Sequence, residues 1–191
     1  MLSQDKITFS PYDRLIKPLL PLIPDKLMPN HLTFLRLIFS PFLIILLLAE
    51  KDLWALALFI ILAFTDMLDG SLARLRNQIT EWGKIWDPIA DKMLIGAVVV
   101  VLLLDINLTL MVLLLAFELA FILGGAFHRL VKDEKIQANV WGNIKMNLQC
   151  FGAVFLILGS FVGLTPLTFF AEILFYISLA FAMASIVKQG I

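Results

Sequence analysis

The chain has 191 residues, of which 61% are hydrophobic and only 16% are charged, and its mean hydropathy of +0.95 lies well outside the range of soluble globular domains. Its 15 basic and 15 acidic residues balance to a formal net charge of zero, which gives no reason to expect nucleic acid as a partner. The single cysteine, Cys150, excludes a disulfide framework within the chain. The composition therefore predicts a one-domain integral membrane protein, with room for roughly six helices of about 20 residues.

Residues 1–30 are predicted to form an interfacial amphipathic segment next to the membrane. Within them, residues 11–28 (PYDRLIKPLLPLIPDKLM) mix leucine and isoleucine with prolines and charges. This stretch is too interrupted to cross a bilayer and too apolar to remain in water, so we expect it to lie on the membrane surface. Charged residues among the first 25 also leave no clean apolar core for a cleavable signal peptide.

The remainder, residues 31–191, is predicted to be an all-α transmembrane domain. Its apolar runs fall at about 31–49, 53–75, 82–104, 107–129, 141–162 and 166–187, and runs of this length can cross the hydrocarbon core of a bilayer. Short polar connections separate the runs, so helices that follow one another should be antiparallel neighbours. The predicted fold is a polytopic membrane protein with six transmembrane helices.

Basic residues indicate how these helices are oriented, because Lys and Arg gather on the cytoplasmic side of a membrane. They lie before the first run, around the second and fourth connections and after the last run, and only Lys51 falls on the other side. We therefore expect a protein of the cytoplasmic membrane with both termini in the cytoplasm. The shared ends of the second and third helices would face the cytoplasm too.

Acidic residues interrupt the second and third runs at Asp66, Asp69, Asp87 and Asp91. Each carboxylate near the bilayer centre costs about 2.5 to 3.5 kcal/mol, so four together need a counter-charge. Spacings of three and four residues put each pair on one helix face, where antiparallel neighbours would bring all four together. A site made only of carboxylates suits two hard divalent cations, Mg²⁺ or Mn²⁺, and paired metal ions suit phosphoryl chemistry.

Two other interpretations of the four aspartates compete with a metal site. The acids could pair with Arg74 and Lys92 in a structural network, but two cations would leave four acids under-compensated. The acids could instead line the path of a cation transporter or channel. Against transport, they cluster at one place, and the sequence has no evident inverted repeat or matched pair of broken helices. Transport remains the alternative function.

The residues around the acids resemble the signature of the CDP-alcohol phosphotransferase family, D-x-x-D-G-x-x-A-R-x(8)-G-x-x-x-D-x-x-x-D. The resemblance extends to every fixed position of the signature: Asp66, Asp69, Gly70, Ala73, Arg74, Gly83, Asp87 and Asp91. Upstream, residues 29–36 (PNHLTFLR) resemble the P-N-x-L-T-x-x-R opening of the family's first helix. Six spans is the family's number, so the resemblance covers most of the chain.

The resemblance implies a chemical role for each matched acid. Asp66, Asp69 and Asp87 would be metal ligands. Asp91 would also touch a metal ion and would act as the catalytic base that takes the proton from the attacking alcohol. The implied reaction transfers a phosphatidyl-type group from a CDP-linked lipid, either CDP-diacylglycerol or an ether analogue, to a small alcohol, and it releases CMP.

The resemblance also implies a site for the CDP-linked lipid. Its small residues would let the cytidine nucleotide lie against the helix backbone, although small residues equally permit close helix packing. Arg74 would hold the diphosphate by charge-assisted hydrogen bonds, unless it serves only as an interfacial charge. The residues assigned to this site are Asn30, Thr33, Asp69, Gly70, Ala73, Arg74 and Gly83.

A second, partial resemblance bears on the acceptor alcohol. Residues 141–149 (WGNIKMNLQ) resemble the G-K-x-K-T-x-x-Q stretch of phosphatidylglycerophosphate synthases at Gly142, Lys145 and Gln149, and depart from it at Asn143 and Met146. That group's Arg-Glu pair in the fourth helix is here Phe117-Glu118.

We expect the acceptor to be glycerol 3-phosphate, with inositol phosphate or phosphatidylglycerol as alternatives. Lys145, Arg129 and Lys132 would bind the acceptor's phosphate, although these residues are equally ordinary cytoplasmic-side charges. The family resemblance also implies a homodimer.

Overall fold

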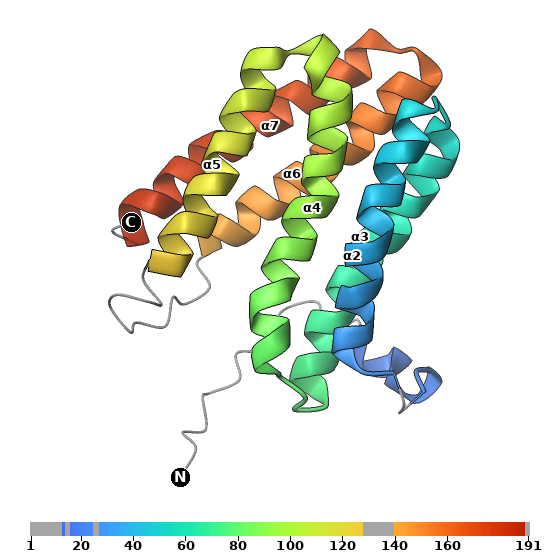
Figure 1. Ribbon diagram of the computed structural model, residues 1–191, viewed down its shortest axis with the longest axis vertical. Coiled ribbons are helices and arrows are strands. Elements are labelled where there is room, and N and C mark those ends of the chain that lie inside the picture. The colour runs from blue at the N-terminus through green and yellow to red at the C-terminus, as the bar shows by residue number, and fades with distance from the viewer. Residues whose placement is uncertain (1–12, 14–15, 25–26, 128–139, 190–191) are drawn as a thin grey trace. The chain divides into compact units, whose positions relative to one another are not determined.

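The structure is a computed structural model that describes residues 13, 16–24, 27–127 and 140–189. All regular secondary structure in these ranges is helical, which confirms the all-α prediction. The elements in chain order are η1 (Lys17–Leu22), α2 (Pro29–Leu48), α3 (Asp52–Leu75), α4 (Glu81–Ile106), α5 (Leu108–Phe127), α6 (Val140–Val162) and α7 (Thr165–Gln189) (Figure 1).

The six α-helices coincide with the six predicted apolar runs. Four of them, α2, α3, α6 and α7, are long and apolar enough to cross a membrane. Helix α4 has more charge within its apolar length, and the apolar part of α5 is shorter, Leu108–Gly124. A protein with several membrane-spanning helices is therefore supported, while the crossing of all six is not established by length and composition.

Large apolar side chains are exposed on every α-helix of the described chain. Examples are Phe34 on α2, Trp54 on α3 and Phe169 on α7, each more than half exposed. A protein folded in water would bury most of such side chains, whereas lipid tails solvate them. The described surface thus agrees with a membrane environment for the helices.

The chain divides into two compact units. The first comprises residues 1–42 and 60–94, and the second comprises residues 43–59 and 95–191. The first unit contains η1, most of α2, the C-terminal part of α3 and the N-terminal part of α4. All four signature aspartates belong to it. The division of the chain at residue 30, into an interfacial segment and a membrane domain, stays a prediction.

Within the first unit, a short turn joins α3 to α4 and reverses the chain (Figure 1). Asn77 has φ +54°, the left-handed conformation that commonly ends a helix, and the Gln78 amide donates to the carbonyl of Ala73 at 2.9 Å. Thr80 then caps α4, because its hydroxyl accepts the Gly83 amide at 2.9 Å. This turn brings the acids of α3 and α4 to the same end of the helix pair.

In the second unit, α6 and α7 pack closely against each other. Gly152 on α6 makes room for Phe175 on α7, since a Cβ atom at position 152 would lie 3.1 Å from the phenyl ring. Asn107 caps α5 through the Leu110 amide at 3.0 Å and also donates to Glu172 on α7 at 2.7 Å. Polar side chains thus tie the start of α5 to α7.

Candidate active site

Arg36 on α2 lies among the four signature aspartates. Its Nη1 donates to Asp66 and, at 2.5 Å, to Asp91 Oδ1, while its Nη2 donates to Asp69 Oδ2 at 2.5 Å. Asp87 Oδ1 lies 4.0 Å from Nη2. The convergence that helix spacing predicted for the four acids is therefore present, with one guanidinium at its centre.

Thr33 extends this cluster by one helical turn of α2. It lies three residues before Arg36, so the two side chains share a helix face. Its hydroxyl donates to Asp87 Oδ1 at 2.5 Å and has a longer contact of 3.4 Å with Asp69 Oδ2. The family resemblance implied that Thr33 belongs to the CDP-lipid site and that Asp69 and Asp87 bind metal ions. Thr33 therefore contacts two of the predicted metal ligands.

The cluster is buried at one end and accessible at the other. The side chain of Arg36 is fully buried and that of Asp69 is only 4% exposed, whereas Asp66 and Asp87 are 36% and 38% exposed. One guanidinium among four carboxylates leaves three formal negative charges within the cluster. A cationic ligand can reach the exposed acids and would be attracted by the remaining charge.

The donor set of the cluster fits hard divalent cations, because all its acidic ligands are carboxylate oxygens. Within the described ranges, however, no three Asp, Glu, His or Cys side chains already form a group that could hold a metal ion. The acids face Arg36 instead, and this guanidinium is itself a cation that the carboxylates bind. The cluster has the ligands for a metal site, and an arginine occupies their centre.

Arg74 has a carboxylate partner away from the four aspartates. The structural-network alternative would have paired it with those acids, but Arg74 pairs with Asp13 in the N-terminal segment. The Arg74 Nε lies 3.2 and 3.0 Å from the two oxygens of Asp13, and its Nη2 donates to Oδ1 at 2.9 Å. A carboxylate thus binds Arg74 in the forked geometry in which arginine also binds phosphate.

Gly70 and Ala73 lie on α3 beside this arginine. A Cβ atom at position 70 would come within 3.3 Å of Arg74 Nη1, so the glycine leaves space for the guanidinium above the helix. Ala73 is half-buried, and its carbonyl accepts the amide that ends α3. The predicted small residues therefore lie next to the predicted diphosphate-binding residue.

Gly83 lies in a polar environment at the start of α4. A Cβ atom there would lie 3.1 Å from Thr80 Oγ1 and 3.3 Å from both Asn30 Oδ1 and Asp87 Oδ2. The Thr80 hydroxyl also donates to Asn30 Oδ1 at 2.8 Å. Sequence reasoning missed Thr80, although a threonine immediately before a helix with an acidic first residue is a signal for a helix cap.

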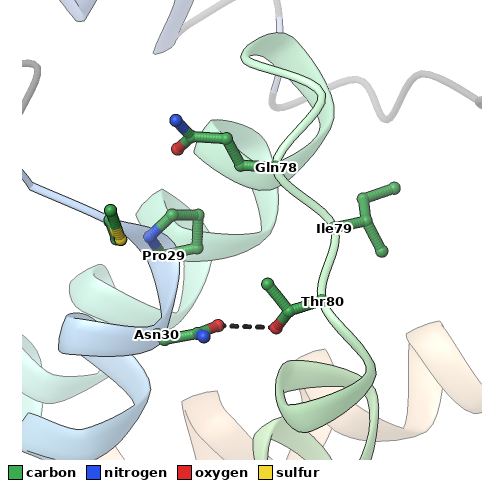
Figure 2. A pocket seen from close by; sticks show the side chains of 6 residues that line it. Pro29, Asn30, Gln78, Ile79 and Thr80 are labelled. Atoms are coloured by element: carbon green, nitrogen blue, oxygen red, sulfur yellow. Dashed lines mark hydrogen bonds between the residues drawn. The ribbon is translucent and has the colours of Figure 1, made fainter.

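A pocket of about 220 Å³ opens beside Asn30. Figure 2 shows Asn30 and Thr80 joined by their hydrogen bond at one edge of this pocket. The start of α2 and the turn before α4 supply its walls, which are lined by Met28, Pro29, Asn30, Gln78, Ile79 and Thr80. Asn30, predicted to bind the CDP-linked lipid, thus faces a cavity.

In the second unit, Lys145 forms a buried ion pair. Its Nζ lies 2.5 Å from Glu118 Oε1 and 4.1 Å from the centre of the Phe121 ring. Gln149, one turn later on α6, donates to the same glutamate oxygen at 2.9 Å. Glu118, which in sequence is only part of a departure from the motif, thus joins two residues that match the motif.

The other two predicted acceptor residues, Arg129 and Lys132, fall outside the residues that the structure describes. Their roles, like those of Lys145 and the residues of the CDP-lipid site, stay predictions. Among the predicted site residues, the four aspartates and Thr33 lie close together.

Comparisons with known proteins agree with the pattern of the site. The family model of CDP-alcohol phosphatidyltransferase matches residues 26–184. A CDP-diacylglycerol–glycerol-3-phosphate 3-phosphatidyltransferase of Rickettsia felis is 36% identical over 160 residues, which are 81% of this chain and 88% of the relative. A protein of the same name from Bacillus subtilis is 28% identical over 174 residues, or 83% of this chain and 90% of the relative.

Proposed function

The chain belongs to the CDP-alcohol phosphatidyltransferase family, and from this premise we propose that it transfers a phosphatidyl group from CDP-diacylglycerol to glycerol 3-phosphate. The observation that carries the proposal is the convergence of the four signature aspartates around one centre. The names of the relatives support glycerol 3-phosphate as the acceptor. The same chemistry with inositol phosphate or phosphatidylglycerol as acceptor is the alternative.

In the proposed mechanism, Asp91 is the general base. Two divalent cations, Mg²⁺ or Mn²⁺, held by Asp66, Asp69, Asp87 and Asp91, would neutralise charge on the diphosphate as the reaction proceeds. Asp91 accepts the proton of the acceptor hydroxyl, and the resulting oxygen attacks the lipid-bearing phosphorus of the donor. The new bond joins this oxygen to phosphorus, the bond to the CMP oxygen breaks, and CMP leaves.

Arg74 is proposed to bind the diphosphate of the donor. Its fork of N–H groups suits phosphate oxygens as well as it suits the carboxylate of Asp13, so the donor and Asp13 would exchange places. Gly70 and Ala73 would leave space for the nucleotide along α3. Asn30, Thr33, Asp69 and Gly83 are proposed to complete the CDP-lipid site.

For the acceptor, Lys145 is proposed to bind the phosphate group, together with Arg129 and Lys132. Lys145 already forms a charge-assisted contact with a carboxylate oxygen, and phosphate oxygens accept the same kind of hydrogen bond.

The proposal also includes the arrangement in the membrane. All six α-helices would cross the bilayer, including α4, whose charges would be compensated within the protein. The distribution of basic residues supports an orientation in which both termini and the active site lie on the cytoplasmic side of the cytoplasmic membrane. The enzyme would act as a homodimer, as the resemblance to the family implies.

Purified protein in detergent micelles tests this function directly. CDP-diacylglycerol is combined with glycerol 3-phosphate, glycerol, inositol phosphate or phosphatidylglycerol, and the release of CMP is measured. We expect CMP only when donor and acceptor are both present, with glycerol 3-phosphate preferred. A protein that makes no CMP with any acceptor but moves cations across reconstituted vesicles would overturn the proposal in favour of a transporter.

A further inference from the structure

We infer that Arg36 is a resident counter-cation of the metal site. Its guanidinium holds the signature aspartates when no divalent cation is bound, and divalent cations have to displace it from them in order to bind. The inference rests on the proposed function, because it assumes that the aspartates hold metal ions. Arg36 thereby sets how tightly the site binds metal, although it neither ligates the metal nor takes part in the transfer reaction.

Competition follows from the oxygens that Arg36 engages. Asp69 Oδ2 and Asp91 Oδ1 lie 2.5 Å from its terminal nitrogens, and Asp66 Oδ1 is bound as well. A divalent cation requires carboxylate oxygens at about 2.0 to 2.6 Å. The guanidinium fills the space between these oxygens and would repel a second cation placed among them. Metal binding and the observed arginine contacts therefore exclude each other.

The attachment of Arg36 suits a side chain that can be displaced. Only its two terminal nitrogens are hydrogen-bonded, whereas its Nε is buried and has no hydrogen-bond partner in the described structure. Displacement breaks contacts at the end of a long side chain without disturbing a bond nearer to the backbone. By contrast, Thr33 holds Asp87 independently of the guanidinium, so one acid keeps its position when the arginine leaves.

The burial of the cluster explains why a counter-cation is needed. Asp69 is almost fully buried, and unpaired carboxylates among apolar helices are strongly unfavourable. A metal-free protein without a cation at this place would expose or protonate its acids. Arg36 therefore stabilises the metal-free protein and, for the same reason, lowers its affinity for metal.

The test compares wild-type protein with Arg36→Gln and Arg36→Lys. In purified protein, Mn²⁺ binding is measured from the electron paramagnetic resonance signal of free Mn²⁺, and the Tm is measured in EDTA and in Mn²⁺. We expect Arg36→Gln to have a lower Tm in EDTA, a larger rise of Tm with Mn²⁺, and a Kd for Mn²⁺ at least about tenfold lower than wild type. Arg36→Lys should lie between them, because a lysine keeps the charge but lacks the fork.

Arg76→Gln is the matched control. Arg76 also lies in the first unit, but it donates to backbone carbonyls such as those of Ile23 and Leu27. Its replacement removes the same charge from the protein and leaves the bonds between Arg36 and the aspartates in place, so the Kd of this control for Mn²⁺ should equal that of wild type. An equal gain of affinity in this control would reduce the effect to net charge and overturn the inference.

Weaker or unchanged Mn²⁺ binding in Arg36→Gln would also overturn the inference, since Arg36 would then assist or ignore the metal. If Arg36→Gln does not fold even with Mn²⁺ present, Arg36→Lys decides by the same criterion. CMP formation by the wild-type protein is a separate result. Normal transfer activity together with unchanged metal affinity in the variants would reject the counter-cation role and leave the proposed function standing.

Discussion

The buried pair of Lys145 and Glu118 allows a decisive test of how the acceptor is bound. The side chains of both residues are largely buried, at 6% and 16% exposure, and their charged atoms lie 2.5 Å apart. Lys145→Met removes the ammonium from the carboxylate of Glu118, to which the Gln149 amide still donates. Breaking a buried ion pair from one side typically costs about 3 to 5 kcal/mol, so we expect a clear loss of stability.

The double variant Lys145→Met/Glu118→Gln separates stability from acceptor binding. Replacing both members of a buried pair is often close to neutral, so most of the lost stability should return. If Lys145 binds the acceptor phosphate, the double variant should still lack a charge-assisted hydrogen bond of about 1.5 to 3 kcal/mol. This corresponds to a loss of roughly 10- to 150-fold in kcat/KM for glycerol 3-phosphate.

Two measurements check this prediction in detergent solution. Thermal unfolding reports the stability of the single and double variants, and CMP release reports kcat/KM for glycerol 3-phosphate and for unphosphorylated glycerol. The loss should be specific for the phosphorylated acceptor, while the affinity for the CDP-linked donor changes little. Recovery of both stability and acceptor use in the double variant would show that Lys145 serves only the packing of its helix.

Three further predictions concern the first unit. Exhaustive EDTA treatment should abolish CMP formation and added Mg²⁺ or Mn²⁺ should restore it; full activity after chelation would contradict a metal site at the aspartates. Asp91→Asn should abolish turnover while CDP-lipid binding persists. As a control, Asp105→Asn at the far end of the same helix should keep activity. Turnover in the Asp91 variant would mean that another group takes the proton. Thr80→Ala should lower the free energy of unfolding by about 1 kcal/mol through the lost cap of α4, as judged by denaturant titration, and an unchanged stability would show that water replaces the cap.

The helices were predictable because they follow local features of the sequence, namely the apolar runs and the short polar connections between them. The run predicted at 141–162 is the helix Val140–Val162, and the run at 53–75 is the helix Asp52–Leu75. Convergence of the four acids was predictable as well, since their spacing fixes a helix face and the short connection reverses the chain. Both depend on residues that are close in sequence.

The partners of the acids were harder to predict because they come from other helices. Helical spacing shows that Thr33 and Arg36 share a face of α2, but not which helix that face contacts. The sequence therefore identified Arg36 only as part of the first-helix motif, and Glu118 only as part of a departure from a motif. One signal was available: Arg36 is a charged residue well inside an apolar helix, and such residues usually have a partner there.

The position of Arg36 in the chain has a consequence for biogenesis. Helix α2 precedes both helices that carry the aspartates, and chains emerge from the ribosome N-terminus first. The guanidinium is therefore synthesised before the first of the four acids, and it is available when the hairpin of α3 and α4 leaves the translocation machinery. A nascent chain with this order can neutralise each acidic helix as it enters the lipid, whereas a permuted chain with α2 at its end would have to insert its acids alone.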